Sequence, residues 1–395
     1  MLKLFFVMKK ILAAVNGDYR SITSRVLAVA RELKKQNYEI VFSGVGTYMS
    51  LVDFPVIKTD HIRADDLEKQ MNISDALCIY TEKNLDYLLA QEQEAIMRVK
   101  PDLILRDILR EPLALVAKQN NIPDVMFQKA TTSPFYTQEL KSNHPFIELA
   151  RPHVKDVTKK IRKKLVNIFY YHLDIKAREM GILDDSGSCS CLEDLTLITD
   201  HPDIFHLDIP KSQAHQYLGP ILEPIKTNNS CWFDDFIRDN RKKILISGGS
   251  TGYHEKDHFF NHIPLDKYAV VFKTVNGFSA NSSYFGNFEI RSLLPYCDVF
   301  INHGGTGSTY FGLLSGVPML MSYDHFEQQA NAVQAANKGV ALLMPHQILN
   351  KENVSLALDY LDDSSFKENS LEVKKMLGDL DSVNKAVEAI KNVLQ

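Results

Sequence analysis

The 395-residue sequence lacks the hallmarks of several protein classes. Its five cysteines are an odd number, and the neighbours Cys189 and Cys191 have a spacing that suits neither a redox Cys-x-x-Cys motif nor a zinc knuckle. No apolar run approaches the roughly 20 residues of a membrane-spanning helix. The apolar start, residues 1–8, is too short for a secretory signal and has no small-residue cleavage site. We therefore expect a reduced, cytoplasmic protein.

Strong charge of one sign is also missing. The chain has 45 basic and 49 acidic residues, a formal net charge of −4, so no global field attracts nucleic acid. The apolar and charged fractions, 45% and 24%, are those of a soluble globular protein. Internal repeats and low-complexity segments are absent from the sequence. Because 395 residues exceed one typical hydrophobic core, we expect two domains.

What is present is an alternation of strand and helix patterns, which is typical of a parallel sheet with helices on both faces. In the first half, strands are predicted at 11–15, 39–43, 101–106, 122–127 and 195–199. Helices are predicted there at 21–36, 111–119 and 146–180. A polar segment, 217–230, is typical of a linker. A second alternating set begins at Lys242, and residues 353–395 are predicted to be helical.

A glycine-rich segment, residues 302–309, is the most informative stretch. It follows an apolar strand at 298–301 and precedes a helix expected at 310–315. Backbone N–H groups at such a turn are free, and the helix dipole adds partial positive charge. The pattern predicts a phosphate or diphosphate site in which His303 and Ser308 add side-chain donors. A glycine-rich turn that binds nothing is the alternative.

A second polar pair follows the next predicted strand, 319–321. Glu327 and Gln328 stand at the beginning of a helix that we expect to open over 324–332. In an open parallel sheet, ligands bind at the carboxyl ends of the strands. An acid and an amide placed there can hydrogen-bond the hydroxyls of a sugar, whereas the alternative is a solvated helix N-terminus with a favourably placed acid.

Together these motifs resemble a known family. His-Gly-Gly-x-Gly-Ser at 303–308, Gly-Val-Pro at 316–318 and Glu-Gln-x-x-Asn-Ala at 327–332 resemble the donor-site signature of the family 1 nucleotide-sugar glycosyltransferases. These are enzymes of the macrolide, antibiotic, sterol and UDP-glucuronosyl type. The resemblance implies an α/β protein of the GT-B fold, in which two Rossmann-like domains with parallel sheets face each other across a cleft.

The resemblance also implies a division of labour. Residues 1–220 would form the acceptor-binding domain and 221–380 the nucleotide-sugar-binding domain, with a final helix at 381–395 packing back on the first domain. The acceptor would be a small molecule, a natural product or a lipid, held by variable loops near 60–95 and 128–160. The protein would be a monomer or a homodimer without a nucleic-acid partner.

Roles in donor binding carry over residue by residue. The diphosphate would contact His303, Gly305, Thr306, Gly307, Ser308 and, in a second glycine–serine loop, Ser250. Glu327 and Gln328 would bind the sugar. The segment 285–297, with Ile290 and Leu293, would meet the nucleobase, and because it lacks the plant-type tryptophan pattern, UDP and dTDP both remain open.

The implied reaction inverts the anomeric carbon and needs neither a metal ion nor a cofactor, since the nucleotide sugar is a co-substrate. Family members usually place a basic histidine in the loop after the first strand, but here that loop, 16–25, contains none. Asp18 is its nearest carboxylate and is the candidate base. Asp107, after the 101–106 strand, is the candidate that orients a base or binds acceptor. General base catalysis typically contributes about 10²–10⁴-fold.

The missing histidine keeps two other functions open. One is a nucleotide-sugar hydrolase or epimerase on the same fold, because water needs no acceptor pocket. The other is a non-catalytic partner protein that retains a transferase fold. The intact donor motif argues against the second.

Two further patterns each have a structural and a functional interpretation. His254–His258 matches the zinc-protease motif, but its helix meets Pro264 and no third-ligand helix follows, so a solvated face is the better account. Residues 151–178 are rich in Lys and Arg with interspersed apolar residues. They could form a peripheral membrane helix. We favour a helix with one buried and one solvated face, a preference that a lipid-linked acceptor would reverse.

Overall fold

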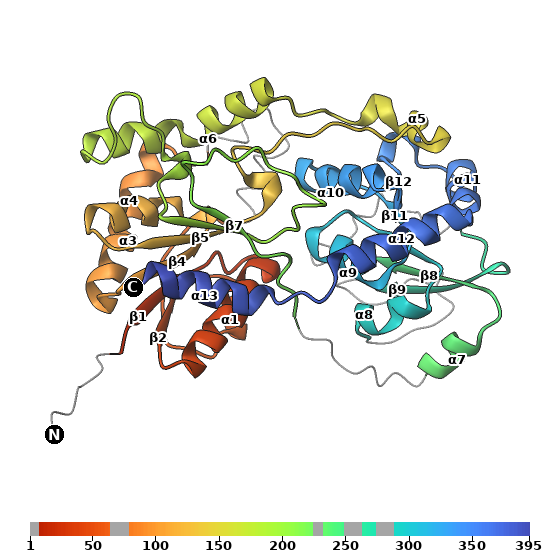
Figure 1. The fold of residues 1–395 in the computed structure, drawn as a ribbon, viewed down its shortest axis with the longest axis horizontal. Coiled ribbons are helices and arrows are strands. Elements are labelled where there is room, and N and C mark those ends of the chain that lie inside the picture. Colours follow the sequence, from red (N-terminus) through yellow and green to blue (C-terminus); the bar gives the residue numbers. More distant parts are fainter. Residues whose placement is uncertain (1–7, 64–78, 224–231, 249–262, 274–287) are drawn as a thin grey trace. The chain divides into compact units, whose positions relative to one another are not determined.

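The computed structural model describes residues 8–63, 79–223, 232–248, 263–273 and 288–395. The chain divides into two units, shown in Figure 1. Unit 1 takes in residues 1–136, 159–223 and 381–395, and unit 2 takes in residues 137–158 and 224–380.

Unit 1 is built on a seven-stranded parallel sheet in the order β3-β2-β1-β4-β5-β6-β7. Its strands are β1 (Lys10–Ala14), β2 (Glu39–Ser43), β3 (Val56–Ile57), β4 (Leu103–Asp107), β5 (Asp124–Gln128), β6 (Leu195–Ile198) and β7 (His215–Tyr217). Every position of β4 and β5 is buried, as expected for central strands that are covered on both faces.

Helices cover both faces of this sheet. They are α1 (Arg20–Lys35), α3 (Glu82–Val99), α4 (Glu111–Gln119), α6 (Lys159–Glu179) and α13 (Ser382–Val393). Alternate residues of β1 point to opposite faces. Ile11 and Ala13 join the core under α1 and α13, whereas Leu12 and Ala14 join the core under α3, α4 and α6. Helix α13 contacts α1 and buries Val387 and Ile390 in the first of these cores.

A buried ionic cluster joins α4 and α6 to the second face of the sheet. Arg106 of β4 is fully buried and faces three carboxylates: Asp124 at 2.8 Å, Glu111 at 3.3 Å and Glu193 at 3.7 Å. The Tyr170 hydroxyl of α6 donates to Glu111 at 2.8 Å. Burial raises the pKa of Glu111 to about 7 and that of Asp124 to about 6, although the guanidinium opposes both shifts. Arg106 therefore supplies one positive charge to three carboxyl groups.

Unit 2 contains a five-stranded parallel sheet in the order β12-β11-β10-β8-β9. The strands are β8 (Lys242–Ser247), β9 (Tyr268–Lys273), β10 (Val299–Asn302), β11 (Met319–Met321) and β12 (Ala341–Leu343). Its helices are α5 (Pro145–Ala150), α7 (Phe233–Arg238), α8 (Ile290–Leu293), α9 (Thr306–Ser315), α10 (Phe326–Asn337), α11 (Lys351–Leu361) and α12 (Ser364–Leu377). The predicted helical region 353–395 is thus divided among α11, α12 and α13.

The single helix predicted over 146–180 is wrong. Helix α5 ends at Ala150, and α6 begins only at Lys159. Pro152 lacks an N–H, so a helical hydrogen bond is lost there, and after a 3₁₀ turn at Arg151–His153 the backbone becomes extended at Val154. In the gap, Val157 pairs with Gln138 in an antiparallel bridge.

The segment 137–158, which the sequence predicts to lie in the N-terminal domain, groups with unit 2. Several hydrogen bonds join it to α10. Asn337 Oδ1 accepts from the Lys141 amide at 2.7 Å, and Gln329 Nε2 donates to the Lys155 carbonyl at 2.9 Å. Among the helices of the described ranges, none has the length and apolarity needed to cross a membrane.

Candidate functional site

The turn between β10 and α9 places backbone donors at the carboxyl edge of the unit 2 sheet. Strand β10 ends at Asn302, and α9 begins at Thr306, four residues earlier than the predicted start. The N-cap position is Gly305, which has no side chain to accept from the first helical N–H groups. Since α9 contains Thr306, Gly307 and Ser308, their amides remain available to an anion at the positive end of the helix.

Gly304 gives this turn its shape. Its φ is +74°, and a Cβ there would lie 2.6 Å from the Gln328 carbonyl oxygen. Asn302 Oδ1 accepts from the Gly304 amide at 2.9 Å, and Asn331 Nδ2 donates to the Gly304 carbonyl at 2.7 Å. The turn is therefore fixed from β10 on one side and from α10 on the other.

The first turn of α10 contributes Glu327 and Gln328. Thr306 Oγ1 donates to Glu327 Oε1 at 2.8 Å, so a predicted phosphate residue and a predicted sugar residue touch each other. Gln328 is buried, and its Oε1 accepts from the Asp324 amide at 2.8 Å. Its side chain thus fixes the loop after β11 in addition to any ligand contact. The Glu327 carboxylate is thus hydrogen-bonded to Thr306, the first residue of α9.

His303 lies at the start of the turn. Burial lowers its pKa, so the imidazole is neutral near pH 7 and can donate or accept a hydrogen bond. Its Nδ1 atom is buried and has no hydrogen-bond partner within the described part of the chain. A Cβ at Gly305 would lie 2.6 Å from His303 Nε2, so glycine is needed there to admit the ring. An unsatisfied ring nitrogen beside free helix amides is the arrangement that a bound oxyanion would complete.

In unit 1, Asp18 follows β1 and is paired with an arginine. Arg63 donates from Nε to Asp18 Oδ2 and from Nη2 to Oδ1, each at 2.8 Å. Asn16 Oδ1 accepts from the Asp18 amide at 3.1 Å. The Arg63 guanidinium therefore engages both carboxylate oxygens of Asp18.

Asp107 is 1% exposed at the end of β4 and serves the backbone. It accepts from the amides of Asn16 at 2.8 Å and Leu109 at 2.7 Å. Burial raises its pKa. Asp107 therefore orients the loop after β1, and its buried carboxylate is shielded from a substrate.

A histidine that sequence reasoning missed lies against the same loop. His61 is buried, with Nε2 2.8 Å from the Val45 carbonyl and Nδ1 3.0 Å from the Ile62 carbonyl. Asn16 Nδ2 donates to the Ile62 carbonyl at 2.9 Å. The segment of His61 was predicted only as a variable acceptor loop, and no local pattern links it to residue 16.

Several known proteins are similar to this chain in sequence. Residues 283–389 match the profile of the erythromycin biosynthesis protein CIII-like C-terminal domain. A UDP-glucosyltransferase, avaP, of Aspergillus versicolor is 24% identical over 248 residues, 55% of this chain and 54% of the relative. The chain thus spans about half the length of that relative. A PGL/p-HBAD biosynthesis glycosyltransferase of Mycobacterium tuberculosis is 22% identical over 376 residues, 90% of this chain and 85% of the relative.

Solved structures of known proteins are also similar to this chain. The glycosyltransferase of kitacinnamycin superposes with a TM-score of 0.72 at 18% identity, covering 98% of this chain and 100% of that one. The spinosyn rhamnosyltransferase SpnG, complexed with thymidine diphosphate, superposes with a TM-score of 0.69 at 12% identity, covering 97% of this chain and 100% of that one. The fold is GT-B. The predicted fold class and the predicted family resemblance are both confirmed.

Within the GT-B fold, the predicted donor residues fall into two groups. His303, Thr306 and Glu327 are brought together around the β10–α9 turn, as are Gly305, Gly307, Ser308 and Gln328. Leu293 of α8 is fully buried, whereas Ile290 is partly exposed. Ser250 and the His254–His258 motif lie outside the described residues.

Unit 2 also contains polar residues to which sequence reasoning gave no role. Asn302 and Asn331 fix the glycine turn, and Gln329 fixes the 137–158 segment by accepting from the Lys155 amide at 3.1 Å. For Asn331 a signal existed, since it stands inside the Glu-Gln-x-x-Asn-Ala motif. Asn302 ends an apolar strand, and nothing in the local sequence distinguishes it from any other polar residue at the end of a strand.

Proposed function

We propose that this chain is an inverting glycosyltransferase that moves a sugar from a UDP- or dTDP-sugar to a hydroxyl of a small natural product or lipid. One observation carries the proposal. The β10–α9 turn joins free helix amides, the unsatisfied Nδ1 of His303 and the Glu327 carboxylate in one site. Amides and imidazole suit a diphosphate, and a carboxylate suits sugar hydroxyls.

Relatives support both nucleotides. SpnG is a rhamnosyltransferase complexed with thymidine diphosphate, and avaP is named a UDP-glucosyltransferase. The diphosphate is common to both nucleotides, and the β10–α9 turn would bind it in either case. A pyrimidine base would meet the backbone near Ile290 and Leu293, at the N-terminal side of β10.

In the proposed reaction, the acceptor oxygen attacks the anomeric carbon from the face opposite the diphosphate. A carbon–oxygen bond forms as the bond to the nucleoside diphosphate breaks, which inverts the configuration. The leaving diphosphate gains negative charge, and fixed donors aimed at it lower the barrier. We propose that the α9 amides and His303 supply this stabilisation in place of a divalent ion. The predictions of a cytoplasmic protein and of a monomer or homodimer stand with this proposal.

Calorimetric titration of the protein with UDP and with dTDP, in the presence of EDTA, tests the donor site. We expect micromolar binding of one nucleotide that is unchanged by EDTA. His303→Ala should weaken binding about 10-fold, since a hydrogen bond to a charged group is worth about 1.5–3 kcal/mol. The matched control is His206→Ala, because His206 is an exposed histidine of unit 1. Failure of both nucleotides to bind the wild-type protein would contradict the proposal.

A second test concerns the base. We expect Asp18→Asn to lower turnover about 10²-fold with an aliphatic alcohol as acceptor and less with a phenol, whose hydroxyl ionises more readily. Arg63→Met should free both carboxylate oxygens of Asp18 for the acceptor hydroxyl. Initial rates with both acceptor types across pH decide the point. If Asp18→Asn leaves turnover unchanged with either acceptor, Asp18 is not the base.

Hydrolysis of the nucleotide sugar is the second candidate function. The observation that favours it is the loop after β1, where no histidine stands and Asp18 is paired at both oxygens with Arg63. Release of free sugar without any added acceptor, at a rate that added alcohols and phenols do not increase, identifies a hydrolase.

A further inference from the structure

The outer face of α6 is a basic and apolar surface with no role in the proposed reaction. The inner face of α6 is the one that packs against the rest of unit 1. Arg162, Tyr170, Leu173 and Ala177 are buried, and α6 contacts α3 and α4. These positions recur at helical spacing, so the opposite side of the helix is turned to solvent.

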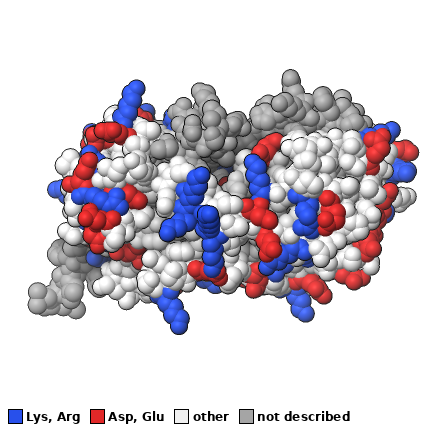
Figure 2. All heavy atoms as spheres, turned by 90° about the horizontal axis from the view of Figure 1, so that it is seen from above, with Lys and Arg blue, Asp and Glu red and all other residues white. Residues whose placement is uncertain are grey.

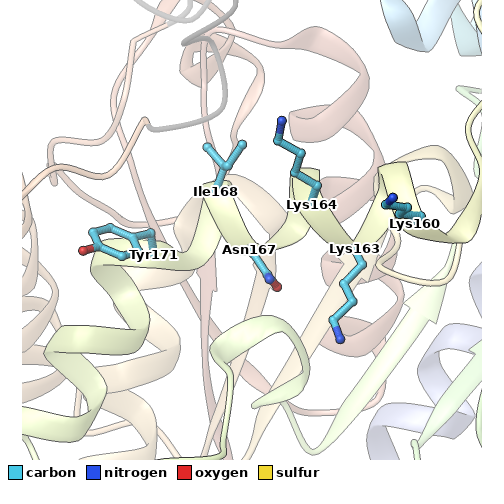
Figure 3. Close-up of a pocket in the computed structure, with 6 residues that line it drawn as sticks. All are labelled: Lys160, Lys163, Lys164, Asn167, Ile168 and Tyr171. Atoms are coloured by element: carbon cyan, nitrogen blue, oxygen red, sulfur yellow. The ribbon is translucent and has the colours of Figure 1, made fainter.

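Six residues of the outer face line a shallow pocket of about 470 Å³. They are Lys160, Lys163, Lys164, Asn167, Ile168 and Tyr171. Figure 3 shows Lys164 and Ile168 reaching to one side of the helix and Lys163 to the other. The three lysines lie within less than two turns in the N-terminal part of α6, and Ile168 and Tyr171 follow them along the helix.

These lysines lie near others on the same helix that do form ion pairs. Lys159 pairs with Asp208 at 2.7 Å and Lys176 with Asp86 at 2.6 Å. Within the part of the chain that the structure describes, no such ion pair is made by Lys160, Lys163 or Lys164. The sequence contains no acid between residues 157 and 173. Figure 2 looks onto the side of unit 1 that carries α6, and basic side chains stand out from this face.

Apolar side chains are exposed beside the lysines. Tyr171 is 58% exposed and Ile175 is 39% exposed, and both lie on the side of α6 opposite the buried residues. A helix face that combines several lysines with apolar and aromatic groups has the composition that inserts shallowly at the boundary between headgroups and acyl chains.

We propose that unit 1 binds the surface of an anionic lipid bilayer through the outer face of α6. Lys160, Lys163 and Lys164 contact the phosphate groups, and Ile168, Tyr171 and Ile175 enter the boundary below them. Charge complementarity requires an anionic partner, and the exposed apolar groups favour a bilayer over an acidic peptide, which would use the lysines alone. This interaction is independent of the donor site in unit 2.

Co-sedimentation of the full chain with vesicles tests the proposal. We expect binding to vesicles of equal parts phosphatidylglycerol and phosphatidylcholine, weaker binding at high salt, and little binding to phosphatidylcholine alone. Changing Lys160, Lys163 and Lys164 together to Gln should weaken binding roughly 100-fold, since each lysine near an anionic surface contributes a factor of about five. Tyr171→Ser with Ile175→Ser should weaken it roughly tenfold and increase its sensitivity to salt.

The matched control changes Lys83, Lys211 and Lys385 to Gln. These lysines are exposed, belong to unit 1 and remove the same charge from other surfaces. Equal losses in the two triple variants would overturn the proposal, as would equal binding to neutral and anionic vesicles or no binding to either. Binding of a polyglutamate peptide through the same lysines, with no vesicle binding, would assign the surface to an acidic protein instead. Unchanged thermal unfolding and nucleotide binding show that each variant is folded.

Discussion

Replacing Arg106 by methionine should lower the free energy of unfolding of unit 1 by about 3–5 kcal/mol, the usual effect of removing one partner of a buried ion pair. Methionine fills a similar volume, so the loss comes from charge. Asp124, Glu111 and Glu193 would remain buried at the junction of the sheet with α4 and α6, without their cation. Each carboxylate would then have to bind a proton or draw in water.

The loss should depend on pH. The pKa of Glu111 is raised in the folded protein from 4.5 to about 7, and that of Asp124 from 3.8 to about 6. Between about pH 4 and 7 the folded state therefore holds more protons than the unfolded state, so the stability from these groups falls as pH rises. Without Arg106 both pKa values rise further. Arg106→Met should thus cost more at pH 8 than at pH 5.

The two units can be followed separately in this experiment. The single tryptophan of the sequence, Trp232, lies in unit 2, whereas far-ultraviolet circular dichroism reports both units. Urea unfolding of Arg106→Met should shift the dichroism transition more than the Trp232 fluorescence transition. Arg98→Met is the control, because the Arg98–Glu94 pair is exposed and worth about 0.5 kcal/mol or less. Equal shifts in the two variants, or an effect independent of pH, would contradict the account.

Gly304→Ala should weaken nucleotide binding about 10- to 100-fold, which corresponds to about 1.4–2.8 kcal/mol. A methyl group at φ +74° is strained, and it would lie 2.6 Å from the backbone oxygen of Gln328. Backbone atoms cannot rotate away as a side-chain tip can. The first turn of α10 must therefore move, which separates Glu327 from Thr306 and displaces the amides of α9. Calorimetric titration with UDP and dTDP measures the change.

The control lies at the other end of the same helix. Gly316 caps α9 at φ +68°, but its Cβ would approach side-chain atoms of Leu371 and Lys374, at 3.1 and 3.2 Å, and would lie at an ordinary contact distance, 3.5 Å, from the Ser370 carbonyl oxygen. Gly316→Ala should lower the stability of unit 2, seen by Trp232 fluorescence, by about 1 kcal/mol. Its nucleotide affinity should match that of the wild type. If Gly316→Ala weakens binding as much as Gly304→Ala, general strain in α9 explains the result.

Much of the fold follows from local patterns. The strand at 39–43 and the helix at 111–119 have the predicted bounds, because apolar runs and helical spacing were strong there. The start of α9 was predicted four residues late, since three glycines in six residues suppress helix propensity. Its N-terminus exists because Asn302 and Asn331 hold the turn. The hydrogen bond from Asn331 spans 27 residues, and such a long-range contact has no periodicity in the sequence.

The donor side of the site was more predictable than the acceptor side. His303, Glu327 and Gln328 stand in two short segments that flank consecutive strands, so strand order alone brings them near each other. By contrast, Arg63 reaches Asp18 across 45 residues, and His61 comes from the same distant segment. Nothing in the loop at 16–25 encodes those partners. The partners of Asp18, the candidate base, therefore became apparent only in the structure.

The packing of α13 against α1 has a consequence for synthesis of the chain. Val387 and Ile390 complete a core whose earlier members end near residue 221, so residues 224–380 of unit 2 are translated before the last segment of unit 1. At about 5–20 residues per second, the early strands wait roughly 10–30 s for their last helix. During that time the α1 face exposes the apolar surface that α13 later covers. A chaperone that binds apolar helical surfaces would find its target here, and only on nascent chains.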